Sequence, residues 1–221
     1  REIYKKSLIE ICPNAKIFYH YGSTEASRSS FIEFRSEQTK LRSVGKPSPN
    51  VKIKIINKSG LELQPNQNGQ IIVKGKMITK GYLNKDDLNK TSFRNGWFHS
   101  GDTGFMDKDG YLYYMGRKDD IINLGGLKVS PQEIEEVLIS FNGISDSAVI
   151  GMKSEDTITN ELIIAFIVLD KEIDIKNLKK YCTECLEPYK IPSKFNIIKR
   201  IPKSSSGKVK RNFLKNSLIV E

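Results

Sequence analysis

Residues 114–135 constrain the fold of this chain more than any other stretch, because one short run combines three structural signals. The run reads YMGRKDDIINLGGLKVSPQEIE. It contains an elbow of basic and acidic residues, 117–120, and then the glycine pair Gly125-Gly126. Its last part, 130–133, combines a serine that favours an N-cap, a proline suited to the first helical position and a glutamate that completes a capping box. The run therefore predicts a change of domain near Gly116 and a helix that begins after the glycine turn.

The composition predicts a globular protein. A chain of 221 residues that is 38% hydrophobic and 9% aromatic can bury the core of one or two domains. No run of about 18 apolar residues is present to cross a bilayer, and residues 1–6, REIYKK, lack the apolar core of a signal peptide. Three cysteines, an odd number, do not form a disulfide framework and suit a reducing compartment. We therefore expect a cytoplasmic protein without a transmembrane segment.

Cys182 and Cys185 form a Cys-x-x-Cys pair, which would also fit a metal or redox site. The apolar residues of 175–186 recur at three- and four-residue spacing, which is typical of an amphipathic helix. No second Cys or His pair lies nearby, as a structural zinc site requires. We therefore expect both thiols to lie in the buried stripe of that helix.

The net charge of +10 comes mostly from lysines that are spread along the chain. A nucleic-acid surface would instead concentrate Lys and Arg in a patch or stripe, or carry an aromatic platform. The sequence has no basic stripe, zinc finger or such platform, so we expect no nucleic-acid partner. A basic balance also suits a protein that handles ATP and other phosphorylated ligands.

Hydrophobic periodicity divides the chain into two halves. The first half has a predicted helix at 3–11, a short buried strand at 17–21, and strands at 51–56, 70–74, 97–100 and 111–115. Turn signals at 57–60 and 107–110 separate these strands, which together suggest a small antiparallel barrel or sandwich. The second half has the capped helix, strands at 147–152 and 162–169, the cysteine-bearing helix, a strand at 195–198 and a helix from about Lys210. We expect an α+β protein whose second half is a compact domain of about a hundred residues.

Four motifs occur in an order that resembles a known enzyme family. They are Tyr21-Gly22-Ser23-Thr24-Glu25, Gly101-Asp102, the run at 114–135, and Ser206-Gly207-Lys208. Together they resemble the AMP-forming adenylating enzymes, the superfamily of acyl-CoA synthetases, peptide-synthetase adenylation domains and luciferases. The resemblance implies that residues 1–116 are the C-terminal portion of a large N-terminal domain, including a small antiparallel β-barrel subdomain. It also implies that residues 117–221 form a compact and mobile α+β C-terminal lid domain.

The motif at 21–25 carries groups that suit the activation of a carboxylate with ATP. This reaction brings two anions together, so it needs cations and donors that stabilise the added negative charge. The resemblance implies a nucleotide-binding role for Tyr21, Gly22, Ser23 and Thr24. Tyr21 would stack near the adenine, and Thr24 would donate to the α-phosphate or the acyl-adenylate. Glu25 would hold Mg²⁺, a hard cation that prefers oxygen ligands, although the five residues would also fit a polar turn after a strand.

Asp102 and Arg117 resemble the family's ribose-binding residues. A carboxylate can accept hydrogen bonds from both hydroxyls of a diol, so the resemblance implies that Asp102 binds the ribose. Arg117 follows at the family's distance as a second contact to ribose or phosphate. An aspartate after a glycine would otherwise fit an ordinary turn. We expect His99 to be a neighbour of the site and not a catalyst, because nothing near it forms a nucleophile–base pair.

The segment 202–211 resembles the family's C-terminal lysine loop and not a P-loop. A P-loop needs a glycine five residues before its Gly-Lys pair and a Ser or Thr after the lysine, whereas this chain has Pro202 and Val209. By resemblance, Lys208 reaches the carboxylate and the α-phosphate during adenylation. A small, flexible Ser/Gly loop would let a compact ammonium be delivered and withdrawn. The other charges of the segment, Lys203, Lys210 and Arg211, are expected to be surface or structural.

The glycine pair and Lys128 are implied to line the channel for the pantetheine thiol in the second half-reaction. Glycine would allow close approach of backbone and ligand at Gly125 and Gly126, although the pair also fits a plain turn before the helix. We expect Lys208 and Gly126 to lie on different faces of one domain, so the domain would have to rotate. Asp119 matches the family's hinge position.

The expected function is that of an AMP-forming ligase, which converts a carboxylic acid to an acyl-adenylate with ATP and Mg²⁺ and then transfers it to CoA. The Gly-Gly-Leu-Lys-Val-Ser-Pro and Ser-Gly-Lys sequences resemble acyl-CoA synthetases more than peptide-synthetase adenylation domains. Two alternatives stay open: an adenylation domain that loads a phosphopantetheine carrier protein, and a non-catalytic binding or regulatory module. The resemblance also makes the chain look like the C-terminal piece of a larger enzyme. We expect this piece to be inactive alone. The residues that would choose the acid lie mostly outside these motifs.

Overall fold

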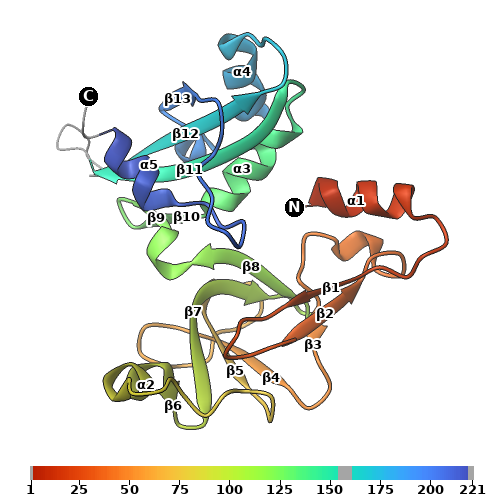
Figure 1. Cartoon of the computed structure of the whole chain (residues 1–221), viewed down its shortest axis with the longest axis vertical. Helices are drawn as coiled ribbons and strands as arrows, with labels where there is room; N and C mark the ends of the chain where they lie inside the picture. Colours follow the sequence, from red (N-terminus) through yellow and green to blue (C-terminus); the bar gives the residue numbers. More distant parts are fainter. Residues whose placement is uncertain (1, 154–160, 219–221) are drawn as a thin grey trace. The chain divides into compact units, whose positions relative to one another are not determined.

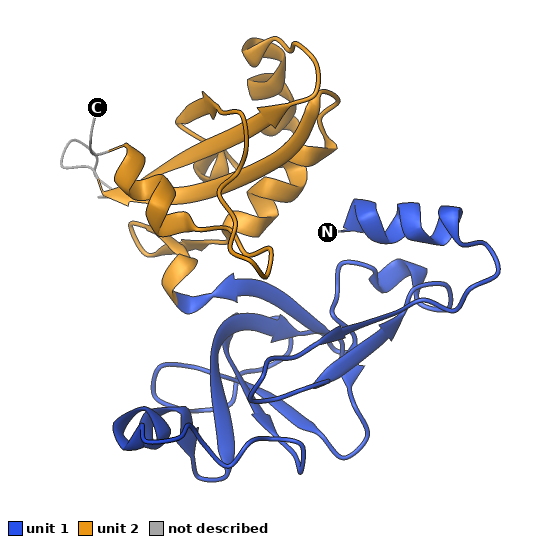
Figure 2. Cartoon of the chain, viewed as in Figure 1, with its two compact units in different colours: residues 1–118 blue, residues 119–221 orange. Residues whose placement is uncertain are grey.

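A computed structural model of the chain describes residues 2–153 and 161–218. Residues 1, 154–160 and 219–221, which fall within the expected domain ranges 1–116 and 117–221, lie outside the described part. The chain forms two compact units, residues 1–118 (unit 1) and 119–221 (unit 2), which Figure 2 distinguishes by colour. Both units contain helices and strands, so the fold is mixed α+β. No helix in the described ranges is long and apolar enough to cross a membrane.

Unit 1 begins with a helix followed by a small antiparallel sheet (Figure 1). The elements are α1 (Glu2–Ile11), β1 (Phe18–Tyr21), β2 (Ser30–Glu33), the 3-10 helix η1 (Gln38–Lys40) and β3 (Lys46–Pro47), with the strands in the order β1-β2-β3. Ile32, Phe34 and Leu41 form a buried cluster, and Ile9 of α1 packs against it. Helix α1 thus contacts the region around β2 through Ile9, while its other large apolar side chains are exposed.

A strand forms at the position expected for 17–21, but it is not buried. Phe18 and Tyr19 of β1 are 61% and 43% exposed. The reason is that β1 is an edge strand, while the buried residues of this sheet lie on β2 and directly after it. A local apolar run predicts a strand, whereas its burial depends on what packs against it from elsewhere in the chain.

The rest of unit 1 is a five-stranded antiparallel sheet. Its strands are β4 (Lys52–Ile56), β5 (Gly69–Lys74), β6 (Phe93–Arg94), β7 (Trp97–Met106) and β8 (Leu112–Arg117). The long strand β7 pairs with β5 along one side and with β6 and β8 along the other. Side chains from four of these strands, together with Ala26 and Val44, form one buried core, which includes Ile55, Ile71, Val73, Phe98 and Leu112. Helix α2 (Asp86–Ser92) leads into β6.

The strands expected in this region are confirmed, and so are the turns at 57–60 and 107–110. Strand β7 extends past its expected end at Ser100 to Met106, while α2 and the short strand β6 were not expected. Within the described residues no ladder joins the outer strands β4 and β8. The backbone pairing therefore joins the five strands into one sheet, and the small barrel expected from the sequence stays a prediction.

Unit 2 follows the expected order of helix, strand, strand, helix, strand and helix. Before this series lie the 3-10 helix η2 (Lys118–Asp120) and a hairpin of β9 (Ile122–Leu124) and β10 (Leu127–Val129). The series itself is α3 (Pro131–Ser140), β11 (Ile144–Lys153), β12 (Glu161–Leu169), α4 (Ile175–Cys185), the 3-10 helix η3 (Pro188–Lys190), β13 (Lys194–Ile197) and α5 (Arg211–Ser217). Strand β12 pairs antiparallel with β11 and parallel with β13.

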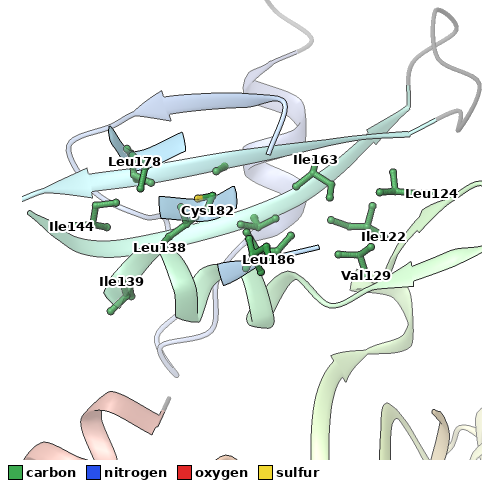
Figure 3. Close-up of a cluster of buried hydrophobic side chains, with 14 residues drawn as sticks. Ile122, Leu124, Val129, Leu138, Ile139, Ile144, Ile163, Leu178, Cys182 and Leu186 are labelled. Atoms are coloured by element: carbon green, nitrogen blue, oxygen red, sulfur yellow. The ribbon is translucent and has the colours of Figure 1, made fainter. Parts of the chain in front are cut away.

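Both faces of the sheet in unit 2 are covered, which explains the unbroken apolar run of β12. Ile163, Ala165 and Ile167 belong to a cluster with α3 and α4, while the alternate residues Ile164 and Phe166 belong to a cluster with α5. Figure 3 shows the first cluster with the side chains of Leu138, Leu178 and Cys182. Unit 2 therefore has a core of its own.

The capping box expected at the start of α3 is not formed. Ser130 is the N-cap residue, but its side chain makes no capping hydrogen bond. Glu133 instead accepts a hydrogen bond from the ammonium of Lys190 at 2.8 Å. The ammonium of Lys190 in η3 thus binds the Glu133 carboxylate, which the local sequence pattern predicted would cap the start of α3.

The expectation that both thiols of the Cys-x-x-Cys pair are buried is wrong for one of them. Cys182 is buried in α4, whereas Cys185 is exposed. The buried stripe of this helix advances in four-residue steps through Leu178, Cys182 and Leu186. Cys185 is three positions after Cys182 and falls outside that stripe.

Candidate active site

The site in unit 1 is built on a bulge in strand β7. Three residues of β7, Ser100, Gly101 and Asp102, lie opposite the single β5 residue Ile71. Gly101 has φ = 73°, a left-handed conformation that other residues rarely adopt. The Ser100 hydroxyl donates to the Ile71 carbonyl at 2.8 Å and accepts from the Asp102 amide at 3.1 Å, so it replaces a missing ladder bond. The bulge therefore places two extra residues in β7 next to Asp102, which stays on the buried side of the strand.

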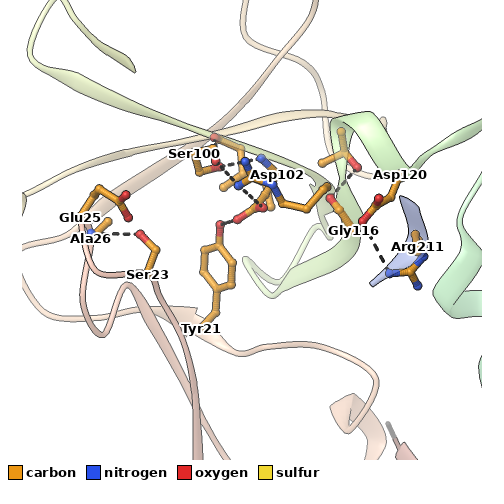
Figure 4. A network of polar contacts seen from close by, with 12 residues as sticks. Tyr21, Ser23, Glu25, Ala26, Ser100, Asp102, Gly116, Asp120 and Arg211 are labelled. Carbon is orange, nitrogen blue, oxygen red and sulfur yellow. Dashed lines mark hydrogen bonds and ion pairs between the residues drawn. The ribbon is translucent and has the colours of Figure 1, made fainter. Parts of the chain in front are cut away.

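Asp102 binds two residues that come from other strands (Figure 4). Tyr21 Oη of β1 donates to Asp102 Oδ2 at 2.5 Å, and Arg117 Nη1 of β8 donates to Oδ1 at 3.2 Å. Arg117 Nη1 also donates to the Ser100 carbonyl at 2.7 Å. Burial, and then the negative charge of Asp102, raises the pKa of Tyr21, so its hydroxyl remains a donor. The structure thus brings together three residues that the sequence singled out separately.

Residues 21–26 form a tight loop directly after β1. The Ser23 amide donates to the Ala26 carbonyl at 3.1 Å, and the Ala26 amide donates to Ser23 Oγ at 3.2 Å. A Cβ on Gly22 would lie 2.7 Å from the Arg28 nitrogen, so glycine is needed for the chain to fold back. Thr24 is exposed in this loop, where a ligand can reach its hydroxyl.

Glu25 is held by the segment that follows β5. Its Oε1 accepts from Tyr82 Oη at 2.7 Å, and its backbone carbonyl accepts from the Thr79 amide at 2.9 Å. Ala26 next to it forms a β-bridge with Ile78. Burial acts to raise the pKa of Glu25, but the hydrogen bond from Tyr82, with smaller hydrogen bonds, lowers it on balance. The carboxylate is therefore ionised at neutral pH.

The donor set at Glu25 fits a magnesium ion that is also bound by a nucleotide. Protein sites usually hold Mg²⁺ with one or two carboxylates together with substrate phosphates and water. Glu25 supplies one ionised and partly exposed carboxylate. No group of three or more His, Cys, Asp or Glu that could hold a metal occurs in the ranges 2–153 and 161–218. A metal at Glu25 would thus take its remaining ligands from the nucleotide and water.

Two contributors to this site were not expected from the sequence. Ser100 orders the bulge, and Tyr82 holds Glu25. Ser100 adjoins Gly101-Asp102, so the motif itself was a signal for it. Tyr82 lies 57 positions from its partner, and no local pattern connects the two.

In unit 2, Lys208 lies in a hairpin turn that leads into α5. A β-bridge between Lys203 and Val209 closes the turn. The Ser204 amide donates to the Lys208 carbonyl at 2.8 Å, and the Gly207 amide donates to the Ser204 carbonyl at 2.9 Å. The turn is thus hydrogen-bonded, and it leaves Lys208 exposed.

The charged residues on both sides of this turn have partners within unit 2. Lys203 forms an ion pair with Asp146. Arg211 Nη2 donates to Glu135 Oε1 at 2.6 Å, and Arg211 Nη1 lies 3.6 Å from Asp120 Oδ2, a contact drawn in Figure 4. Lys203 and Arg211 therefore anchor the turn, in agreement with the structural role expected for them.

Gly125 and Gly126 connect β9 and β10 in a two-residue hairpin. Their φ angles are 57° and 98°, and two positive φ angles are the requirement of a type I′ turn. A Cβ built on Gly126 would meet nothing within 4 Å among the described residues, so the outside of the turn is open. Lys128 is exposed on β10 beside it.

The expected hinge residue lies at the boundary between the two units, which falls between Lys118 and Asp119. On the unit 1 side, Thr103 Oγ1 donates to the Gly116 carbonyl at 3.1 Å. On the unit 2 side, Asp120 makes the ion pair with α5 described above. Lys118 and Asp119 thus lie between two anchored segments.

Sequence profiles of two domains match the chain. The profile of the AMP-binding enzyme family matches residues 2–83, which include the loop at 21–26 and Tyr82. The profile of the AMP-binding enzyme C-terminal domain matches residues 133–208, which end at the lysine of the turn. Each profile therefore covers part of one unit.

Relatives found by sequence are CoA ligases. The 2-succinylbenzoate–CoA ligase of Bacillus subtilis is 38% identical over 203 residues, which make up 91% of this chain and 41% of that protein. The 2-succinylbenzoate–CoA ligase of Oceanobacillus iheyensis is 37% identical over 213 residues, 95% of this chain and 43% of that protein. The chain thus spans less than half the length of these relatives.

A solved structure with a similar fold is o-succinylbenzoate CoA synthetase from Bacillus subtilis, in complex with the acyl-adenylate intermediate OSB-AMP. It matches with a TM-score of 0.87 at 37% identity and covers 95% of this chain and 43% of its own. The similarity in sequence and in structure therefore extends over nearly all of the chain. The chain belongs to the AMP-binding enzymes, the adenylate-forming superfamily that includes these CoA ligases.

Proposed function

We propose that the protein carrying this chain activates a carboxylic acid with ATP to an acyl-adenylate and then transfers the acyl group to CoA. The observation that carries this proposal is the loop at 21–26. Its first residue, Tyr21, binds Asp102, and its carboxylate, Glu25, is held by Tyr82. One short loop thereby links a candidate ribose acceptor to a candidate metal ligand, which is what a nucleotide site requires.

The nucleoside of ATP is the ligand we assign to the cluster around Asp102. Both ribose hydroxyls are donors, and a carboxylate already aligned by Tyr21 and Arg117 can accept them with little reorganisation. The ring of Tyr21 is partly exposed, and it would stack near the adenine. The neighbouring residues Gly22 and Ser23 give the loop its folded-back path.

In the first half-reaction, a carboxylate oxygen of the acid attacks the α-phosphorus of ATP. An acyl–oxygen–phosphorus bond forms, the bond to the bridging oxygen breaks, and pyrophosphate leaves. Thr24 donates to the α-phosphate, and the ammonium of Lys208 offsets the negative charge that accumulates on the carboxylate and phosphate. Mg²⁺ held at Glu25 would supply further positive charge at the phosphates.

In the second half-reaction, the sulfur of CoA attacks the acyl carbon and AMP leaves. The open hairpin at Gly125-Gly126 and the exposed Lys128 would line the path of the pantetheine arm. Rotation of unit 2 about Asp119 would move the turn that carries Lys208 away from the reacting groups and bring the Gly125-Gly126 hairpin to them. The anchored segments on both sides of Lys118 and Asp119 support this hinge, because they confine the change in backbone torsion to a few residues.

We also infer the expected domain boundaries and subdomain. Residues 1–116 would be the end of a large N-terminal domain, with the five-stranded sheet of unit 1 as its small barrel subdomain, and residues 117–221 the lid. Register shifts in the pairing of β7 with β5 and β8 support the barrel, since bulges increase the twist of a sheet. The three cysteines are free thiols, which supports a reducing compartment such as the cytoplasm.

The acid we propose is 2-succinylbenzoate, because the relatives reported above are ligases for this compound. The test is pyrophosphate exchange into ATP by the complete protein that contains this chain. Exchange should depend on 2-succinylbenzoate and should be far weaker with acetate or a long-chain fatty acid. If no acid supports exchange in a protein that binds ATP, the proposed adenylation is wrong.

The acceptor is tested in the same preparation. Free CoA should yield an acyl-CoA thioester, whereas a phosphopantetheine carrier protein should not be loaded. The reverse result would identify an adenylation domain that serves a carrier protein.

A further inference from the structure

We propose that Tyr82 is a positioning residue for Glu25, and that Asn89 of α2 holds Tyr82 in place for this purpose. The inference deepens the proposed function, on which it rests, because it assigns a role to side chains outside the four sequence motifs. Neither residue needs to touch the substrate. Their effect would pass through the carboxylate to the metal-bound nucleotide.

The first observation is that one short segment surrounds Glu25. Residues 78–82 contact the loop through the β-bridge of Ile78 with Ala26, through the Thr79 amide on the Glu25 carbonyl, and through the Tyr82 hydroxyl on Oε1 at 2.7 Å. The backbone contacts fix the position of the Glu25 main chain, and the Tyr82 hydroxyl fixes the orientation of the Glu25 carboxylate. Main chain and side chain of this residue are therefore set by the same segment.

The second observation is that Tyr82 is itself held from both sides. The Tyr82 amide donates to Asn89 Oδ1 at 2.7 Å, and Asn89 Nδ2 donates to the Tyr82 carbonyl at 2.8 Å. The Tyr82 ring meets Phe93 edge-on, with a distance of 5.6 Å between ring centroids. A Cβ on Gly81 would lie 2.9 Å from the Asn89 side chain, so the glycine permits this close approach.

The third observation concerns α2, which carries Asn89. None of its residues is buried, so the helix adds little to the hydrophobic core. Its Asn89 makes two hydrogen bonds to one residue of a neighbouring loop. The helix therefore acts mainly as a support for the segment that surrounds Glu25.

The physical consequence is a carboxylate with one preferred orientation. The Tyr82 hydroxyl binds Oε1 at 2.7 Å, so it restricts rotation of the Glu25 carboxylate. The Tyr82 hydroxyl is the donor of this hydrogen bond, and the contacts of Asn89 hold the Tyr82 main chain in place. Groups that orient a metal ligand in this way commonly change metal affinity or activity by about 10- to 100-fold when they are removed.

The test is Tyr82→Phe in the complete protein, because this change removes the hydroxyl and keeps the ring on Phe93. Calorimetry would measure the Kd of ATP with Mg²⁺ and with EDTA. We expect Tyr82→Phe to weaken binding of Mg²⁺-bound ATP about 10-fold and to leave metal-free ATP binding unchanged. Tyr113→Phe is the matched control, since the Tyr113 hydroxyl donates to the carboxylate of Asp107 in the β7–β8 hairpin at 3.3 Å.

A second variant, Asn89→Ala, removes the support and leaves the hydroxyl in place. It should weaken Mg²⁺-dependent ATP binding in the same direction, and it decides the question if Tyr82→Phe does not fold. Equal losses with and without Mg²⁺, or unchanged binding in both variants, would overturn the positioning role. If the wild-type protein gains no ATP affinity from Mg²⁺, the failure lies with the proposed function. If the wild type gains affinity and both variants match it, only the role of Tyr82 fails.

Discussion

The carboxylate of Asp102 is aligned before any ligand binds, because Tyr21 and Arg117 donate to its two oxygens. A buried carboxylate without partners would be costly, so these donors stabilise the site as well as orient it. The side chain of Asp102 is only 10% exposed, whereas that of Arg117 is 54% exposed. Arg117 can therefore shift toward a ligand while Asp102 stays fixed.

Lys208 is exposed and, within the described residues, no ion pair holds its side chain, whereas Lys203 and Arg211 are held by ion pairs. Lys208→Ala should lower adenylation by about 10²-fold or more, because it removes a charge that acts in the transition state. Thioester formation from supplied acyl-adenylate should be nearly unchanged. The two steps are measured as pyrophosphate exchange and as conversion of acyl-adenylate with CoA.

Lys210→Ala is the matched control for this change, since Lys210 is also an exposed lysine and lies two positions further along the chain. It should leave both steps intact. Equal loss of both half-reactions in Lys208→Ala would show that Lys208 is structural and has no special role in adenylation.

The chemistry of single residues could be predicted from the sequence, but most of their contacts could not. The roles expected for Asp102 and Glu25 came from the resemblance of their motifs to those of the adenylating enzymes. The bond from Tyr21 to Asp102 spans 81 positions, and Asp102 lies at the register shift between β7 and β5. Long-range hydrogen bonds of this kind depend on strand register, which the local pattern does not specify.

At the scale of elements, the hairpin at Gly125-Gly126 allows a sharp test of the thiol channel. Gly126→Leu should add bulk on the open side of the turn and obstruct thioester formation, while adenylation is retained. A leucine at φ = 98° also strains the backbone, by about 1–2 kcal/mol for a left-handed residue. The measurement is CoA-dependent product set against pyrophosphate exchange.

Gly110→Leu controls for that strain. Gly110 has φ = 81°, and a Cβ there would likewise meet nothing within 4 Å among the described residues, but it lies in the β7–β8 turn. It should lower stability to a similar extent without separating the two half-reactions. Unimpaired thioester formation in Gly126→Leu would leave the glycine pair as an ordinary turn.

Elements with a strong periodic pattern were predictable, and short ones were not. Strands β11 and β12 and helix α3 follow from continuous or helically spaced apolar residues that are buried in the two clusters of unit 2. Strands β3 and β6 have two residues each, and α2 has no buried residue, so none of them carries a hydrophobic pattern. Their positions follow from pairing and from side-chain contacts to other elements. The support for Glu25 was missed for this reason.

At the scale of the whole molecule, each buried cluster lies within one of the two units. The two clusters of unit 2 draw their residues from positions 122–218, and those of unit 1 from positions 9–114. Unit 1 exposes several large apolar side chains on its first elements, among them Ile3, Leu8, Phe18 and Tyr19. The sheet of unit 2, in contrast, has buried residues on both faces. The two units therefore differ in how completely they bury their own apolar surface.

We accordingly expect residues 119–221 to fold alone. A domain of about a hundred residues with a core on both faces of its sheet is large enough for cooperative folding. Thermal unfolding followed by circular dichroism should give one sharp transition, in the range of about 45–65 °C that is common for such domains. Leu138→Ala in this piece should destabilise it by about 2–5 kcal/mol, because Leu138 is fully buried in the cluster between α3 and the sheet. A broad transition, with no effect of Leu138→Ala, would mean that unit 2 depends on the rest of the protein for its core, and a lid that rotates as a rigid body would then be excluded.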